Sequence, residues 1–322
     1  MAAAPPADSV ERFRLDLEAL AGPGGDFAVA VSGGPDSLAL LLLAHAAFSG
    51  RVRAATVDHR LRPGSAAEAE AVARLCAERG IPHHILAVTV ERAGAGLQAA
   101  AREARYRALA EWMEEGGLEL LLTAHHADDQ AETLLMRLNR GSGVAGLAGV
   151  RAAGAVPGSG GRLRLARPLL HWRRSELAAL VAAAGIEPAE DPSNADEAFD
   201  RARIRRQLGE APWLDVAALA RSAALLAEAE SALEWAAETL FAARAEGGEG
   251  GVILRPQGLP PELLRRLVLR CLGLAAPGAR PRGEQLHALI ARLQEGGSAT
   301  LCGVKASGGD SWRFAPAPAR RR

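Results

Sequence analysis

A Gly-rich segment near the start of the chain has the residue types of an anion-binding loop. It reads Ser32, Gly33, Gly34, Pro35, Asp36 and Ser37. The glycines let backbone amides turn toward a ligand, Pro35 suits the first position of a helix, and free amides at a helix N-terminus bind anions. Asp36 cannot bind phosphate directly, so it indicates a bridging Mg²⁺ or a cationic group. An ordinary strand–turn–helix junction with Asp36 as a cap is the alternative, but the position before a helix-length apolar run favours a nucleotide site.

Three carboxylates lie within five residues further along the chain, at Asp128, Asp129 and Glu132. Asp129 and Glu132 are three residues apart and therefore share one face of a helix. Acidic residues stabilise any helix N-terminus, so capping is one interpretation. Three exceed what capping needs, and they are able to hold Mg²⁺ or to orient an ammonium group and take its proton. The preceding His125 and His126 do not favour zinc, because adjacent histidines rarely converge on one metal.

Two further groups offer basic and hydrogen-bonding side chains. One consists of Arg102, Arg105 and Tyr106, whose spacing of three and four residues puts them on one helix face. A solvated arginine face is the alternative. The other group follows an apolar run and consists of Asp58, His59 and Arg62. Side chains at the carboxyl end of a strand face the ligand site of a parallel sheet, although an Asp-His pair is equally a turn-capping device.

Composition excludes several other kinds of site. Lys305 is the only lysine among 38 basic residues, so the first 300 residues hold neither a Walker-A lysine nor a Schiff-base lysine. Phosphate must therefore be bound by backbone amides, hydroxyl groups and arginines. The three cysteines, Cys76, Cys271 and Cys302, form no CxxC pair, which excludes a disulfide scaffold and a zinc ribbon. We interpret all three as small buried apolar residues.

These groups need a scaffold, and the first half of the chain predicts one. Short apolar runs alternate with helix-length segments, which indicates an α/β fold with a parallel, Rossmann-like sheet and helices on both faces. The strands are expected at 26–31, 52–58, 83–90 and 118–124, and the helices at 37–48, 65–79, 97–115 and 128–139. Ligands of such sheets bind beyond the carboxyl ends of the strands, where the loop, the Asp-His pair and the carboxylates lie.

The second part of the chain has a different sequence pattern, without the regular alternation of apolar runs and helix-length segments. We expect a first domain over residues 1–210 and a smaller, mainly helical domain over 211–322, with a terminal hairpin near 299–314. Acidic and basic residues number 38 each, yet arginines gather at 151–180 and 201–206. Such patches suffice for phosphate contacts with RNA, although a solvated face is the more frequent case. No apolar run approaches 18 residues and no secretion signal is evident, so we expect a cytoplasmic protein.

Several stretches resemble motifs of the PP-loop ATP pyrophosphatases of the N type. Residues 32–37 have the SGGxDS pattern of that family, whose members split ATP between the α and β phosphates. Other stretches resemble the lysidine synthetases within it. These are 58–62 (DHRLR), 101–106 (AREARY), 125–133 (HHADDQAET), 139–143 (NRGSG), 167–170 (RPLL), and 191–205 with its DPSN and RARIR. Ala202 is one departure, because the family usually has Asn there.

The resemblance implies ATP-dependent ligation of free lysine to carbon 2 of the wobble cytidine in an isoleucine tRNA with a CAU anticodon, through an adenylated tRNA intermediate. It implies Mg²⁺ on Asp36 and catalytic roles for Asp36, Asp129, Glu132, Arg102 and Arg205. ATP would contact residues 32–37 with Asp58, His59 and Arg62. The other substrates would contact Arg105, Tyr106, His125, His126, Asp128, Thr133, Arg140, Gly141, Asp191, Asn194 and Arg201. Family members as short as this chain are also candidates for homodimers.

Two other functions remain open from the sequence. A tRNA thiolase shares the loop and the kind of substrate, but thiolases usually need paired or catalytic cysteines, and none lies near these motifs. A catalytically silent nucleotide- or RNA-binding module would also keep the loop, but the intact carboxylates argue against it. ATP-dependent release of AMP would separate such a module from an enzyme.

Overall fold

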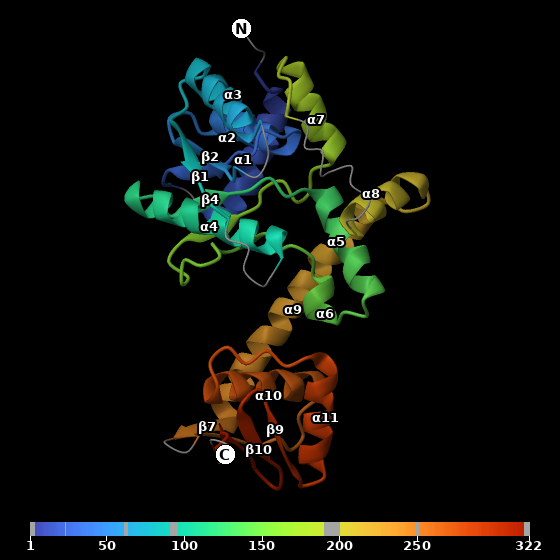
Figure 1. Cartoon of the computed structure of the whole chain (residues 1–322). Helices are drawn as coiled ribbons and strands as arrows, with labels where there is room; N and C mark the ends of the chain where they lie inside the picture. Colours follow the sequence, from blue (N-terminus) through green and yellow to red (C-terminus); the bar gives the residue numbers. More distant parts are fainter. Residues whose placement is uncertain are drawn as a thin grey trace. The chain divides into compact units, whose positions relative to one another are not determined.

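The computed structural model describes residues 4–22, 24–60, 64–90, 96–189, 200–248 and 251–318. The chain divides into two compact units, Met1–Ala227 and Glu228–Arg322, and each has its own hydrophobic core (Figure 1). The boundary between the units falls within helix α9 (Val216–Arg244). Among the described helices, none is both long enough and apolar enough to cross a membrane.

The first unit is built on a six-stranded sheet with the order β3-β2-β1-β4-β6-β5. Neighbouring strands are parallel except for β5, which is antiparallel to β6. The strands are β1 (Phe27–Ala30), β2 (Val52–Asp58), β3 (His83–Ala87), β4 (Leu120–Leu122), β5 (Ala153–Ala155) and β6 (Arg164–Ala166). Strand β1 lies between β2 and β4, so the loop that follows it opens at the middle of the sheet. The predicted parallel α/β fold is confirmed.

Successive side chains of β1 point to opposite faces of the sheet, and each face has its own core. Phe27 and Val29 pack on one face, and Ala28 packs on the other. The first face is covered by α1 (Ala7–Ala21), α2 (Pro35–Ala47), α3 (Ser65–Glu78) and α7 (Arg174–Ala183). The second face is covered by α4 (Leu97–Glu115), whose Tyr106 joins the core there. The helix that begins in the Gly-rich loop and the helix that carries Arg102 therefore lie on opposite faces.

Helix α5 (Ala127–Asn139) follows β4 and packs against α6 (Val144–Leu147) and α8 (Asp200–Glu210). Helix α8 was not predicted. An amphipathic surface helix is identified in a sequence by a stripe of apolar residues. Helix α8 has no such stripe, because its sequence includes Arg201, Arg203, Arg205 and Arg206.

The second unit combines helices with a five-stranded antiparallel sheet of the order β7-β8-β11-β10-β9. After α9 come β7 (Ala245–Gly248), β8 (Gly251–Leu254), α10 (Pro261–Ala275), α11 (Gly283–Gln294), β9 (Ser298–Leu301), β10 (Val304–Ser307) and β11 (Trp312–Pro316). Its core joins Trp312 and Phe314 to Leu267 and Val268 of α10. The sequence predicted the helices and a terminal hairpin, but not β7 and β8, which are short and flank a run of glycines.

The cysteines differ in their burial. Cys76 and Cys271 are buried as predicted, and burial raises the pKa values of their thiols to about 11 and about 12. Cys302 is exposed, which corrects the prediction. It occupies the tight turn between β9 and β10, where its φ is 49°. Lys305, on the neighbouring strand β10, is also exposed.

Candidate active site

Serine hydroxyls organise the loop between β1 and α2. Ser37 Oγ accepts a hydrogen bond from the Ser32 amide at 3.1 Å, donates to the Gly34 carbonyl at 2.9 Å, and lies 3.1 Å from Ser32 Oγ. Gly34 is the N-cap of α2, and Pro35 occupies its first turn. The first turn of α2 therefore presents backbone amides at the carboxyl end of β1, a geometry that binds anions.

Gly33 fixes the course of this loop. It has a φ of +85°, and its carbonyl accepts a hydrogen bond from the Ala189 amide at 2.9 Å. A Cβ at this position would lie 3.5 Å from side-chain atoms of Ala189 and Val72, an ordinary contact distance. The positive φ, rather than lack of space, is therefore what favours glycine here.

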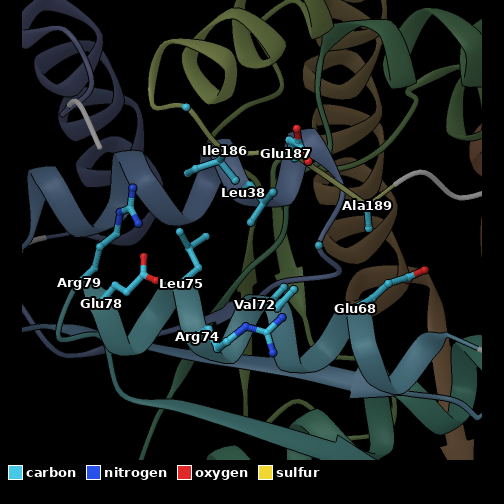
Figure 2. Close-up of a pocket in the computed structure, with 13 residues that line it drawn as sticks. Leu38, Glu68, Val72, Arg74, Leu75, Glu78, Arg79, Ile186, Glu187 and Ala189 are labelled. Carbon is cyan, nitrogen blue, oxygen red and sulfur yellow. The ribbon is translucent and has the colours of Figure 1, made fainter. Parts of the chain in front are cut away.

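A pocket of about 250 Å³ lies beside Gly33, between α3 and the segment 185–189 (Figure 2). Its lining combines apolar and charged side chains, namely those of Leu38, Val72, Leu75, Ile186, Glu68, Arg74, Glu78, Arg79 and Glu187. Among the described residues that were predicted to bind ATP, only Gly33 lines this pocket. The pocket therefore borders the loop without containing the residues expected to carry the chemistry.

His126 connects the loop to α5. It is the N-cap of that helix, where its Nδ1 accepts from the Asp129 amide at 3.4 Å and its amide donates to Asp129 Oδ2 at 3.0 Å. The ring is buried, and its Nε2 lies 3.4 Å from Asp36 Oδ2. The structure thus brings Asp36, His126 and Asp129 together. Capping was one interpretation of the acidic residues here, and the cap of α5 is made by His126 together with Asp129.

Asp36 has an oxygen atom that is free to bind a ligand. Its Oδ1 is buried and has no hydrogen-bond partner within the described part of the chain. A buried acceptor without a partner is costly, and such atoms call for a bound ion or water. In the same described ranges, no group of three or more Asp, Glu, His or Cys side chains could hold a metal ion. Mg²⁺ commonly takes one or two carboxylates together with phosphate oxygens, so Asp36 fits a Mg²⁺ ion bound with ATP.

The pKa values of His126 and Asp129 are both raised. Burial alone would lower the pKa of His126, but the hydrogen bond to Asp36 and the charges of Asp129, Asp36 and Asp128 outweigh it. Burial raises the pKa of Asp129, in spite of the positive charges of His126 and Arg201. Both groups therefore keep a proton to higher pH than they would in water.

Two arginines of α8 form ion pairs with the carboxylate of Glu132. This side chain is 1% exposed, and its Oε2 accepts from Arg201 Nε at 2.6 Å while its Oε1 accepts from Arg205 Nε at 2.7 Å. Arg201 Nη2 also donates to Asp129 Oδ1 at 2.8 Å. These contacts attach α8 to α5. They also mean that guanidinium groups hold the oxygen atoms for which the sequence suggested an ammonium group.

Asp128 faces a different helix. Its Oδ2 accepts from the Arg174 amide at 2.8 Å, and the Arg173 guanidinium contacts both of its oxygens at 3.3 Å. Burial would raise the pKa of Asp128, but these hydrogen bonds lower it overall. The structure therefore separates Asp128 from the pair formed by Asp129 and Glu132, and ties it to the start of α7.

Basic side chains surround Tyr106 on α4. The buried Tyr106 hydroxyl accepts from Arg102 Nη2 at 3.4 Å, and the guanidinium groups of Arg102 and Arg105 lie 4.9 and 5.5 Å from its ring centroid. Arg167 also lies near Tyr106, which opposes the lowering of the Arg167 pKa by burial. Three residues of α4 that the sequence placed on one face are thus together, with Arg167 added from the end of β6.

His125 lies next to this group. Its Nδ1 is 3.3 Å from Arg167 Nε and 3.2 Å from Thr123 Oγ1, and both can donate to it. Burial, followed by the charges of Arg167 and Arg102, lowers the pKa of His125 to about 3. The ring is therefore neutral near pH 7, with its proton on Nε2.

At the end of β2, Asp58 Oδ1 accepts from the Arg60 amide at 2.9 Å, and hydrogen bonds with Ser65 and Arg60 lower the pKa of Asp58. Asp58 therefore stabilises the turn into α3. His59 Nδ1 is buried without a partner among the described residues, and burial lowers the pKa of His59. Three other predicted residues lie outside the described ranges, namely Arg62, Asp191 and Asn194.

The remaining predicted residues lie along α5. Thr133 is half-buried and follows Glu132, and none of the contacts described above involves it. Arg140 and Gly141 follow the last turn of α5, about 20 Å from its N-terminus at the helical rise per residue. The structure therefore does not bring Arg140 and Gly141 to Asp129.

The sequence placed Arg167 and Arg173 only in the arginine patch of 151–180, as candidates for phosphate contacts, and did not predict them as residues of the active site. Arg167 is only 8% exposed, and Arg173 pairs with Asp128. The available signal for Arg167 was its position directly after an apolar strand, where a charged residue at the carboxyl end of a parallel sheet faces the ligand site.

Known proteins resemble this chain along most of its length. The sequence model of the PP-loop domain matches residues 11–211. The tRNA(Ile)-lysidine synthase of Novosphingobium aromaticivorans is 49% identical over 97% of this chain and 95% of its own length. The protein of that name from Zymomonas mobilis is 45% identical over 92% of this chain and 90% of its own length.

Among solved structures, the U34-tRNA thiolase of Methanococcus maripaludis with its 4Fe-4S cluster has a TM-score of 0.55 at 16% identity. The match covers 69% of this chain and 79% of the thiolase chain. A likeness at that identity shows the fold alone. The sequence matches go further, because they extend through both units at more than 40% identity. The chain belongs to the tRNA(Ile)-lysidine synthase family of PP-loop proteins.

Proposed function

We propose that this chain uses ATP to ligate free lysine to carbon 2 of the wobble cytidine of an isoleucine tRNA with a CAU anticodon, which changes the codon read from AUG to AUA. The observation that carries the proposal is the meeting of Asp36, His126 and Asp129 beside an anion-binding helix N-terminus. Relatives named for lysidine synthesis match nearly the whole chain, which supports the same reaction.

In the first step, the carbon-2 oxygen of the cytidine attacks the α-phosphorus of ATP, and pyrophosphate leaves. The amides of the first turn of α2 and the hydroxyls of Ser32 and Ser37 bind the phosphates. Mg²⁺, when bound, offsets the charge of the leaving pyrophosphate. Asp36 would hold it through the buried Oδ1. His59 directly follows β2 on the strand next to β1, and the family resemblance assigns it to ATP binding.

In the second step, the amine of lysine attacks carbon 2, and AMP leaves. A protonated amine cannot attack, so the ammonium group must first lose a proton. We assign the acceptor role to Asp129, because its raised pKa makes it a stronger base than an exposed carboxylate. Glu132 holds Arg201 and Arg205, which places two guanidinium groups where they stabilise the negative charge of the adenylate.

Incorporation of labelled lysine into unmodified isoleucine tRNA with ATP and Mg²⁺ tests the function. We expect labelling with this tRNA, none with methionine tRNA, and a loss of at least a hundredfold in Asp36→Ala. Asp26→Ala is the matched control, because Asp26 is an exposed carboxylate before β1 that pairs with Arg53 at 3.4 Å. AMP release without lysine transfer would keep the adenylation chemistry and overturn lysidine as the product. Absence of AMP release with any RNA would favour the silent binding module.

We also propose that the second domain contacts the tRNA. Trp235, on the part of α9 that belongs to the second unit, is 71% exposed, and exposed aromatic rings stack on unpaired bases. We expect Trp235→Ala to weaken tRNA binding about tenfold with unchanged ATP affinity. Leu274→Ala is the control, because Leu274 is an apolar residue of the same unit that is 63% exposed. Equal tRNA affinities in the two variants would contradict this assignment.

A homodimer is a further proposal, and it is supported by the family resemblance alone. Light scattering tests it, because one chain has a mass of 33.5 kDa and a dimer has twice that mass. A single species with the mass of one chain at working concentration would overturn it.

A further inference from the structure

Arg102, Arg105 and Arg167 have no carboxylate partner within the described part of the chain. Their contacts are with the ring and hydroxyl of Tyr106, with His125 Nδ1, and, for Arg167 Nη1, with the Arg151 carbonyl at 2.6 Å. Burial lowers the pKa values of Arg105 and Arg167, the direction expected of a cation without a close anionic partner. Arg102 is exposed, Arg105 is half-buried and Arg167 is buried. Buried charges are normally paired, so Arg105 and Arg167 call for an anionic ligand, which the exposed Arg102 is able to contact as well.

The cluster lies on the other side of the sheet from the loop that binds ATP phosphates. Arg102 and Arg105 project from α4, which packs on the face that contains Ala28. Helix α2 packs on the face that contains Phe27, and Arg167 follows β6, which is separated from β1 by β4. The carboxyl edge of the sheet therefore has two positions for anions, one at the start of α2 and one beside α4.

We propose that Arg102 and Arg105, supported by Tyr106 and Arg167, bind a backbone phosphate of the RNA next to the nucleotide that is adenylated. This inference rests on the proposed function, in which an RNA and ATP must meet at one edge of the sheet. The two substrates share phosphate chemistry, and the start of α2 already supplies donors for ATP. His125 suits an RNA site, because its neutral Nε2–H adds a donor without adding charge.

A chemical double-mutant cycle tests the phosphate contact in the full-length protein. The RNA is the anticodon hairpin of the CAU isoleucine tRNA, either natural or with uncharged methylphosphonates on both sides of the wobble nucleotide. We expect the neutral linkages to weaken binding to the unmodified protein about tenfold, and Arg102→Gln to weaken binding of the natural hairpin by the same factor. Combining both changes should produce no further loss. Arg102→Gln should also reduce the slope of log affinity against log salt by about 0.7.

The control variant is Arg53→Gln, which removes the same charge near the amino end of β2, away from the carboxyl edge. It should bind both hairpins as the unmodified protein does. Arg105→Gln provides a second variant, and thermal unfolding checks that both proteins are folded. Losses that multiply in the combined experiment would overturn the proposal. A loss of ATP affinity in Arg102→Gln, with hairpin binding unchanged, would assign the arginine to ATP and overturn it as well.

Lysine incorporation by the unmodified protein keeps this test separate from that of the proposed function. If lysine is incorporated but the losses multiply, only the phosphate site is wrong. If the hairpin changes are coupled as expected but no lysine is incorporated, the proposed reaction is wrong and the RNA phosphate site stands.

Discussion

Two adjacent histidines in this chain respond to acid in opposite directions. The pKa of His125 is lowered to about 3, so the folded protein resists its protonation. The stability it contributes is present above the unfolded pKa near 6.5 and is lost as the pH falls below that value. The pKa of His126 is raised, so its contribution is present below about 6.5 and is lost as the pH rises through the folded pKa.

Denaturant unfolding of His125→Asn and His126→Asn at pH 5.5 and pH 8 measures these contributions. Relative to the unmodified protein, His125→Asn should gain about 1 kcal/mol on going to pH 5.5, because the variant no longer pays for a buried imidazole that resists protonation. His126→Asn should lose stability on the same change. A shift of the same sign in both variants would contradict the assignment.

Glu132 is the residue on which the junction of α5 and α8 depends. Glu132→Gln removes the charge between Arg201 and Arg205, and we expect a loss of about 2 kcal/mol in the free energy of unfolding. The expected loss is below the usual value for a buried pair, because Arg201 and Arg205 are 44% and 30% exposed. Glu70→Gln breaks the exposed pair with Arg74 and should cost less than about 0.5 kcal/mol. Equal losses in the two variants would contradict the prediction.

For individual residues, sequence spacing predicted which side chains share a helix face, but it did not predict which other side chains they contact. Asp129 and Glu132 do lie together, as three-residue spacing requires. Their partners come from Arg201 and Arg205, about seventy positions later in the chain, and no local pattern encodes such a contact. Asp128 turns to α7 for the same reason, since its partner Arg173 is set by how two helices pack.

At the scale of elements, the turn before β5 depends on a glycine beside α5. Gly149 has a φ of +63°, and a Cβ there would fall well inside contact distance of Gln130 Oε1. Gln130 cannot simply move, because its amide group donates to the Val150 carbonyl at 2.8 Å and accepts from the Val150 amide at 2.7 Å. Gly149→Ala should therefore cost about 2 kcal/mol in the free energy of unfolding, from backbone strain together with lost hydrogen bonds.

Gly158→Ala is the comparison for that variant. Gly158 has a φ of +83° with no atom within 4 Å of the added Cβ, so only backbone strain of about 1 kcal/mol is expected. Chemical denaturation of both variants provides the measurement, and equal costs would show that the contact with Gln130 is unimportant.

Elements with strong apolar periodicity were predictable from the sequence. Strands β1 to β4 and helices α2 to α5 lie within a few residues of their predicted positions, because buried strands and helices each require long apolar faces. The amphiphilic signal fails for α8, which is attached through charged side chains, and for β7 and β8, which are short. At α3, Ser65 and Glu68 have the spacing of a capping box, but the N-cap is Gly64 and no side-chain hydrogen bond caps this helix.

At the scale of the whole molecule, the two units have separate cores, so a substitution in one core should destabilise mainly the unit that contains it. Leu267 is fully buried in the core of the second unit, and Leu267→Ala should destabilise that unit by about 3 kcal/mol. Hydrogen exchange should then accelerate in α10, α11 and β8 to β11, while the amides of β1 and β4 keep their protection. Leu41→Ala, in the core around α2, should give the reverse pattern. Loss of protection along the entire chain in both variants would show that the units unfold together.

The scarcity of lysine protects an enzyme of this kind from reacting with itself. An adenylated cytidine is an electrophile that any neutral amine within reach can capture, whereas guanidinium groups stay protonated and do not compete. The first unit contains no lysine, and Lys305 is the only side-chain amine in the sequence. Arginines such as Arg201 and Arg205 thus supply positive charge next to the carboxylates without supplying a nucleophile. A single Arg205→Lys exchange would place an amine there, and we expect a covalent protein–RNA adduct in place of part of the normal product.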